Sequence, residues 1–161
     1  MKELESYLND HLAGSVSALE LIGHWRDVQK AEPLGGFFAE AEREIKADQD
    51  ILRDVMRCLG IKESSVRKAG AWVGEKIGRA RLMIAGDEPD SLGLVLSLEA
   101  LIMGILGKKL MWRALAATKL PKLPKWDFEE LQRRAEDQIE RAENERIQAA
   151  QRAFASTRNN N

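Results

Sequence analysis

The sequence lacks the features that indicate a secreted, disulfide-bonded or β-rich protein. It contains a single cysteine, Cys58, which cannot form an internal disulfide. The first residues mix acidic and apolar side chains, whereas a secretory signal opens with a basic and then an apolar segment. Apolar and polar residues nowhere alternate over the length of a strand, so no glycine-rich phosphate loop can follow one. These absences predict an all-α protein in a bacterial-type cytoplasm.

Apolar residues recur at intervals of three and four along most of the chain, which is typical of amphipathic helices. The pattern predicts five long helices, over residues 3–31, 37–59, 64–85, 90–118 and 127–155. Gly60 is placed to end the second helix, and Asp127 with Glu130 to cap the start of the last. A chain of 161 residues can fold around one core without disulfides. We expect one domain over residues 1–156 and a disordered tail over 157–161.

The second predicted helix carries an apolar row that we expect to face the core. The row comprises Phe38, Ala41, Ile45, Leu52, Val55 and Leu59. One acidic residue, Asp48, interrupts this row. Asp48 is therefore a candidate site residue.

The segment from Leu92 to Leu106 carries a single charge, on Glu99. As a helix it would be about 22 Å long, shorter than the roughly 30 Å needed to cross a bilayer, so we interpret it as core. Glu99 shares a helical row with the apolar Leu92, Leu96, Met103 and Leu106. A lone carboxylate in a core requires a metal, a cation or a proton to neutralise it. The sequence therefore predicts that apolar neighbours enclose Glu99 and that one of these three compensates its charge.

Positive charge is concentrated in the middle of the chain. Residues 61–126 contain 12 basic and 6 acidic residues, a net charge of +6. This excess is consistent with binding an anionic surface, or with docking onto the more acidic first helices of the same fold. The basic residues are scattered and lack interleaved aromatic residues, so we do not expect nucleic-acid binding. We interpret the four tryptophans, Trp25, Trp72, Trp112 and Trp126, as packing residues and helix-end anchors, and the less favoured alternative is an interfacial patch for lipid or protein formed by Trp112, Trp126 and nearby basic residues.

Four acidic residues, each in a different predicted helix, resemble a known pattern. They are Glu20, Asp48, Glu99 and Glu136. With four long helices and a long connection between the second and the next bundle helix, the chain resembles the ferritin-like superfamily over nearly its whole length. It is most similar to small bacterial members that open with a segment such as Tyr7 to Gly14. The resemblance implies an up-down bundle, with the predicted helix 64–85 as an additional crossover helix, and a carboxylate-bridged di-metal site.

The chain departs from the ferritin-like pattern at two metal ligands. Where the family places histidines, three residues after two of its acids, this sequence has Ile51 and Ile139. His24, four residues after Glu20, could assist as a ligand. Carboxylates without imidazoles suit magnesium or manganese better than an oxygen-activating iron pair. We therefore expect no cofactor, with a divalent metal (iron, manganese or magnesium) as the alternative.

Three functional interpretations follow, and none includes a catalytic residue. Cys58 has no Lys or His arranged to activate it, and no serine-based triad can be assembled. The first interpretation is a non-catalytic bundle, an interaction or structural protein that forms a homodimer and could bind a protein partner. The second is a metal-binding protein with the oxidoreductase chemistry that the resemblance implies, through Glu20, Asp48, Glu99, Glu136 and His24. The third binds an anionic surface through the basic middle third, although we do not expect a membrane as its partner.

Overall fold

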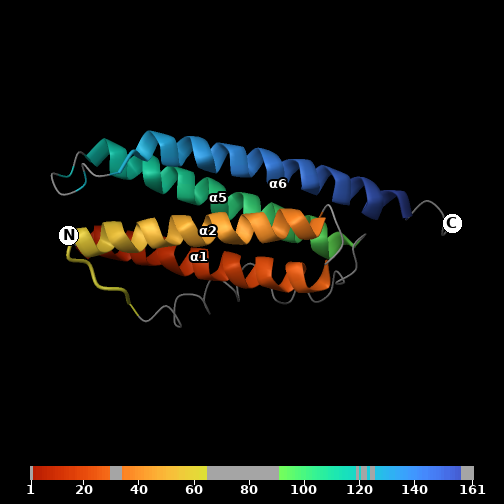
Figure 1. Cartoon of the computed structure of the whole chain (residues 1–161), viewed down its shortest axis with the longest axis horizontal. Helices are drawn as coiled ribbons and strands as arrows, with labels where there is room; N and C mark the ends of the chain where they lie inside the picture. The colour runs from red at the N-terminus through yellow and green to blue at the C-terminus, as the bar shows by residue number, and fades with distance from the viewer. Residues whose placement is uncertain are drawn as a thin grey trace.

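The part of the chain that the structure describes forms two layers, each an antiparallel pair of helices (Figure 1). The structure is a computed structural model that describes residues 2–29, 34–64, 91–118, 120, 123 and 126–156. One layer contains α1 (Lys2–Val28) and α2 (Leu34–Cys58), and the other contains α5 (Leu92–Thr118) and α6 (Phe128–Ser156). No strand occurs in these ranges, so the prediction of an all-α bundle is confirmed.

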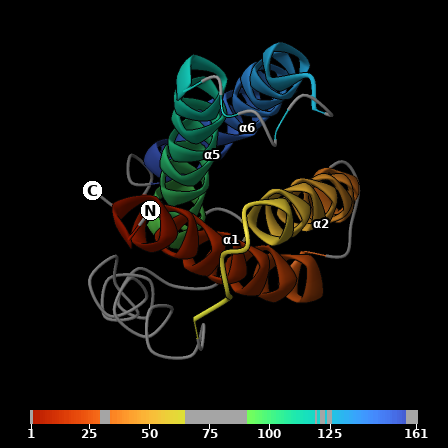
Figure 2. The same ribbon diagram turned by 90° about the vertical axis from the view of Figure 1, so that its left-hand side faces the viewer.

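The helix directions follow from the ion pairs and from the colour order in Figure 1. α2 and α5 run in the same direction, whereas α1 and α6 run opposite to them. The end of α2 and the start of α5 therefore lie at opposite ends of the bundle. Within each layer the helices pack closely, and α1 also packs against α5, as the end-on view in Figure 2 shows.

Four of the five predicted helices are present, with ends shifted by a few residues. The first ends at Val28 and not at residue 31, and the N–H of Gln29, which follows it, still donates to the carbonyl of Trp25. The second begins at Leu34 and not at residue 37, so Gly35 and Gly36 lie inside the helix. The predicted helix 64–85 and the tail 157–161 lie outside the described residues, apart from Ser64, which is not helical.

The apolar core is divided into two clusters, one toward each end of the bundle. In one cluster Trp25 stacks on Phe38, with ring centroids 6.5 Å apart. In the other Trp112 stacks on Phe128, with ring centroids 6.0 Å apart. The predicted inner row of α2 is confirmed, since all its members are buried, and it contributes to both clusters. Asp48 lies in this row between the two clusters and is itself buried.

The end of α2 is fixed by its backbone and by α1. Gly60 has a φ of 71°, which favours glycine, and its N–H donates to the carbonyl of Arg57. The Ile61 N–H donates to the carbonyl of Met56, which completes a Schellman motif. The prediction that Gly60 ends this helix is confirmed. Asn9 of α1 then accepts the Ser64 N–H at 2.7 Å, which holds the chain against α1.

The row of α5 that carries Glu99 points outward, so its predicted place in the core is wrong. Met103, Leu106 and Leu110 are 61%, 43% and 51% exposed, and the Glu99 side chain is 44% exposed. α5 buries the opposite side, including Leu98 and other residues of both clusters. A helix that is apolar on every side carries no periodic signal to show which side faces inward. Within the described ranges, no helix is long and apolar enough to span a membrane.

Candidate functional site: a buried charge layer

Asp48 lies at the centre of a polar layer that separates the two apolar clusters. The side chain of Asp48 is only 4% exposed, so it depends on protein donors in place of water. Helix periodicity explains its position, because residues 45, 48 and 52 share one face of α2. The layer is completed by side chains from the opposite pair of helices, α5 and α6.

Two side chains donate hydrogen bonds to Asp48, and a third forms an ion pair with it. Lys108 of α5 donates from Nζ to Oδ2 at 2.5 Å, and Arg134 of α6 lies 2.9 Å from Oδ1 through Nη2. Gln138, one turn after Arg134 on α6, donates from Nε2 to Oδ2 at 3.3 Å. Lys108 also donates to Oε1 of Gln138. Asp48 thus joins α2 to both helices of the other layer.

The layer brings together charged side chains from α2, α5 and α6. Lys108 and Arg134 bring two positive charges to the single negative charge of Asp48. The Arg134 side chain is 35% exposed, so water solvates part of its charge, whereas Lys108 is 14% exposed. Burial lowers the pKa of Lys108 below its ordinary value, and the neighbouring Asp48 carboxylate opposes this shift. Glu44, one turn before Asp48 on α2, also acts on Lys108 and opposes the lowering of its pKa.

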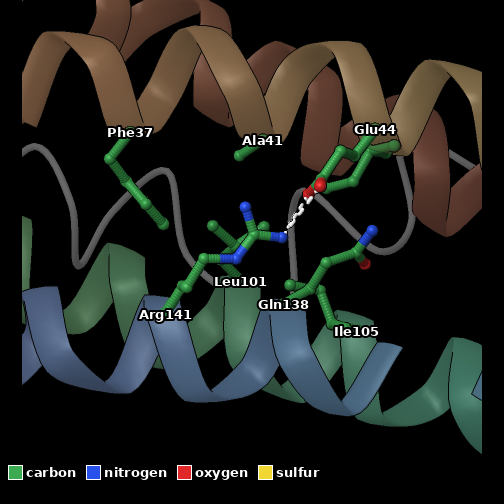
Figure 3. A pocket seen from close by; sticks show the side chains of 8 residues that line it. Phe37, Ala41, Glu44, Leu101, Ile105, Gln138 and Arg141 are labelled. Carbon is green, nitrogen blue, oxygen red and sulfur yellow. Dashed lines mark hydrogen bonds and ion pairs between the residues drawn. The ribbon is translucent and has the colours of Figure 1, made fainter. Parts of the chain in front are cut away.

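A second bridge joins α2 to α6 on the same side of the bundle. Figure 3 shows Arg141 reaching from α6 to Glu44 on α2, beside Phe37 and Ala41. Nη2 of Arg141 lies 2.8 and 2.7 Å from the two carboxylate oxygens of Glu44. Nη1 of Arg141 lies 3.2 Å from Glu40. The helices α2 and α6 do not pack as closely as the helices within a layer, so these long side chains bridge the distance between them.

The acidic residues predicted as metal ligands lie in different surroundings. Glu20 is exposed on α1, and Glu136 is 54% exposed and forms an ion pair with Lys109 at 2.8 Å. Glu99 lies 3.5 Å from Arg146, a cation as in one of the predicted alternatives, but its side chain is 44% exposed, so the prediction that apolar neighbours enclose it is wrong. It is wrong because Glu99 lies on the outer side of α5, where water reaches it. Asp48 is the only one of the four that is buried.

The structure does not bring the predicted ligands together. His24 is exposed on α1, with its ring against Trp25. The part of the chain that is described contains no group of three or more His, Cys, Asp or Glu side chains that could hold a metal ion. Trp112 is fully buried, which confirms its interpretation as a packing residue and excludes the alternative of an interfacial patch that includes it. Asp48 pairs with the cationic side chains of Lys108 and Arg134, which compensate its charge and hold the carboxylate in position.

The partners of Asp48 were missed in the sequence, although one of them carries a signal. Lys108 and Gln138 lie 60 and 90 residues from Asp48, beyond the reach of helix periodicity. Gln138, however, falls on the same row of α6 as Leu131, Ala135 and Ala142, all of which are buried. A polar residue on an apolar row could have been identified as an inward-facing partner.

Comparison with known proteins adds no relative. No protein-family model, no curated protein and no solved structure matches the chain. The ferritin-like resemblance therefore depends on the sequence pattern alone and stays a prediction.

Proposed function

We propose that this protein is a non-catalytic interaction protein that acts as a homodimer, joined through the outer face of α5. The observation that carries the proposal is the exposure of Met103, Leu106 and Leu110, large apolar side chains within two turns of one helix. Single exposed apolar residues are ordinary on a protein surface, whereas a continuous apolar row is typical of an interface. We call Glu99, Met103, Leu106, Leu110 and Arg113 the α5 outer row.

The charges of the α5 outer row favour a second copy of the chain as the partner. Glu99 and Arg113 each lie seven residues from Leu106, on opposite sides of it. In an antiparallel pair of α5 helices centred on Leu106, Glu99 of one copy would face Arg113 of the other. A parallel pair would place Glu99 against Glu99 and is disfavoured by repulsion. The row is thus complementary to itself under a two-fold axis, as an isologous dimer requires.

The neighbouring ion pairs support this arrangement. Lys109 with Glu136, and Glu99 with Arg146, lie along the boundary of α5 and α6. They provide a polar margin beside the apolar row, as interfaces commonly have. Arg113 is exposed and forms no ion pair with any described residue, so it can pair with a second copy at little cost.

The test measures the molar mass in solution by sedimentation equilibrium. The unaltered protein is expected to be a dimer, and Leu106→Arg is expected to be a monomer, because it places two like charges at the two-fold axis. Val28→Arg is the matched control, since Val28 is also an exposed apolar residue but lies at the end of α1. This variant should remain a dimer. Circular dichroism would check that both variants keep their helical content.

A charge exchange tests the antiparallel register. Glu99→Arg alone should weaken the dimer, because it opposes Arg113 of the second copy. The double variant Glu99→Arg with Arg113→Glu should restore it, since the complementary pair is rebuilt in reverse. A monomeric unaltered protein, or a Leu106→Arg variant that dimerises equally well, would overturn the proposal. Failure of the double variant to regain affinity would overturn the register.

A further inference from the structure

A cavity of about 180 Å³ lies between α1, α2 and α5, beside the buried charge layer. Its walls are mainly apolar and include Ile45, Leu52, Ile105, Met111 and Trp112. The exposed Asp10 and Gly104 bring it to the surface. The cavity thus has the apolar walls and the opening that small-molecule sites have.

Small residues on α1 and α5 keep this cavity open. Gly14 and Ala18 line it from α1, and Gly104 and Gly107 line it from α5. Glycine in a helix usually allows a neighbouring backbone to approach closely. A Cβ at Gly14 or Gly104, however, would meet no atom within 4 Å, so close packing does not account for these two glycines. Although glycine weakens a helix, here it borders an open space that a ligand would fill.

Polar side chains of the lining are already paired within the protein. Gln49 donates from Nε2 to Oγ of Ser15 at 2.8 Å, and Ser15 donates to the carbonyl of Leu12 at 2.6 Å. Lys108 donates to Asp48 at 2.5 Å. A water needs about two to four polar partners to occupy a cavity, and these pairs leave few such groups free. The space is therefore suited to an apolar occupant.

The charge of the lining favours a neutral ligand. The charges of Asp48 and Lys108 compensate each other within their ion pair. Burial lowers the pKa of His11, which also lines the cavity, so its ring is neutral at neutral pH. The remaining charge, on Asp10, would repel an anion. Because Asp10 is exposed at the opening, water screens its charge and weakens its attraction for a cation.

We infer that this cavity binds a neutral, apolar small molecule about the size of one aromatic ring. A dry cavity of about 150 Å³ in another protein accepts benzene, which sets the scale for the ligand. The ring would contact Ile105, Met111 and Trp112, and removal of its apolar surface from water would drive binding. The inference uses the side of α5 that faces α1 and does not depend on the proposed dimer.

The binding test uses toluene as the probe and the full chain labelled with ¹³C at the methionine methyl groups. Titration should shift the methyl resonance of Met111, assigned with Met111→Leu, through the ring current of the ligand, and the shift should saturate. Met56 is also buried but does not line the cavity, so its methyl resonance should stay in place.

Two charged relatives of toluene test the assignment of a neutral ligand. Benzoate and benzylammonium have the same ring with a negative and a positive group, respectively. Burying either charge without a free partner is costly, so each should bind about tenfold more weakly than toluene or worse.

Two glycine variants on α1 provide a matched control. A Cβ at Gly14 or at Gly23 would meet no atom within 4 Å, so both positions accept a larger side chain. Only Gly14 of these two lines the cavity. Gly14→Leu should therefore abolish toluene binding, whereas Gly23→Leu should bind toluene as the unaltered protein does.

Three results would overturn the inference. They are no saturable shift of the Met111 methyl with toluene, equal toluene binding by Gly14→Leu and the unaltered protein, and binding of benzoate or benzylammonium as tight as that of toluene. The first two would remove the site, and the third would remove the assignment of a neutral ligand.

Discussion

The carboxylate of Asp48 on α2 accepts a 2.5 Å hydrogen bond from the ammonium of Lys108 on α5, between two apolar clusters. Taking two charges out of water is costly, and their attraction compensates only while both are present. The pair therefore determines how α2 and α5 are aligned, because sliding one helix past the other would leave a charge in an apolar cluster.

Removing one partner of this pair should destabilise the fold strongly. Asp48→Ala leaves Lys108 buried without its carboxylate, and we expect a loss of about 3–5 kcal/mol in the free energy of unfolding. Urea denaturation followed by circular dichroism measures this loss. Asp54→Ala is the control, since Asp54 pairs with Arg57 on the surface of the same helix and should cost under about 0.5 kcal/mol. Equal effects of the two variants would contradict the assigned role of Asp48.

Replacing both charges together should cost far less than replacing one. The double variant Asp48→Leu with Lys108→Leu fills the space with apolar side chains and leaves neither charge of the pair buried. Such replacements are often neutral or stabilising. Arg134 can turn its partly exposed guanidinium toward water. In a double-mutant cycle we expect the double variant to recover most of the stability lost in Asp48→Ala, and additive losses would contradict this expectation.

Arg141 should stabilise the contact between the two layers, but less than Asp48 does. Arg141→Met keeps most of the apolar stem and removes the charge that reaches Glu44. Because the Arg141 side chain is 38% exposed, we expect a loss of only about 0.5–1 kcal/mol, decreasing at high salt. Arg133→Met is the control, since Arg133 pairs with Glu130 along the same helix and joins no layers. A larger effect of Arg133→Met would contradict this interpretation.

The two glycines Gly60 and Gly23 should respond to alanine in opposite directions. Gly60 has a positive φ, so Gly60→Ala should cost about 1 kcal/mol. Gly23 lies inside α1 with open space for a Cβ, so Gly23→Ala should stabilise the protein by about 0.5–1 kcal/mol. Thermal unfolding of the two variants would show midpoint shifts of opposite sign. Shifts of the same sign would contradict the assigned backbone conformations.

His11 should make stability depend on pH on the acid side. Burial lowers the pKa of His11 in the folded protein, and the nearby Asp10 carboxylate only partly opposes this. Between the folded pKa and the ordinary value near 6.5, the unfolded chain binds more protons, so stability rises with pH across this window and falls on acidification. His11→Gln should flatten that slope in urea denaturation series, with His24→Gln as the control. An unchanged slope in His11→Gln would contradict the assignment.

Much of the fold could be predicted because it depends on local patterns. The inner row of α2 has a clear helical period, and all its members, Asp48 included, are buried. Gly60 ends this helix as predicted, because the required left-handed conformation favours glycine. Asp127 caps α6 as predicted, accepting the Glu130 N–H at 2.9 Å. Each of these predictions depends on residues within one or two helical turns.

The orientation of α5 could not be predicted in the same way. Glu99 marks the outer side of this helix, but in a segment so apolar it suggested an enclosed charge instead. Met103 and Leu106 are as apolar as the residues that α5 buries, so composition alone could not distinguish the two sides. The expectation about Glu99 failed for this reason.

The sequence by itself determined that the chain is helical, where four helices lie to within a few residues, and which side of α2 faces inward, because these properties depend on short-range periodicity and backbone sterics. Only the tertiary structure decided which acidic residue is buried, which cations hold it, and which side of α5 remains exposed. Those outcomes depend on contacts between residues such as Asp48, Lys108 and Gln138, which are far apart in the chain and meet only when the two layers pack.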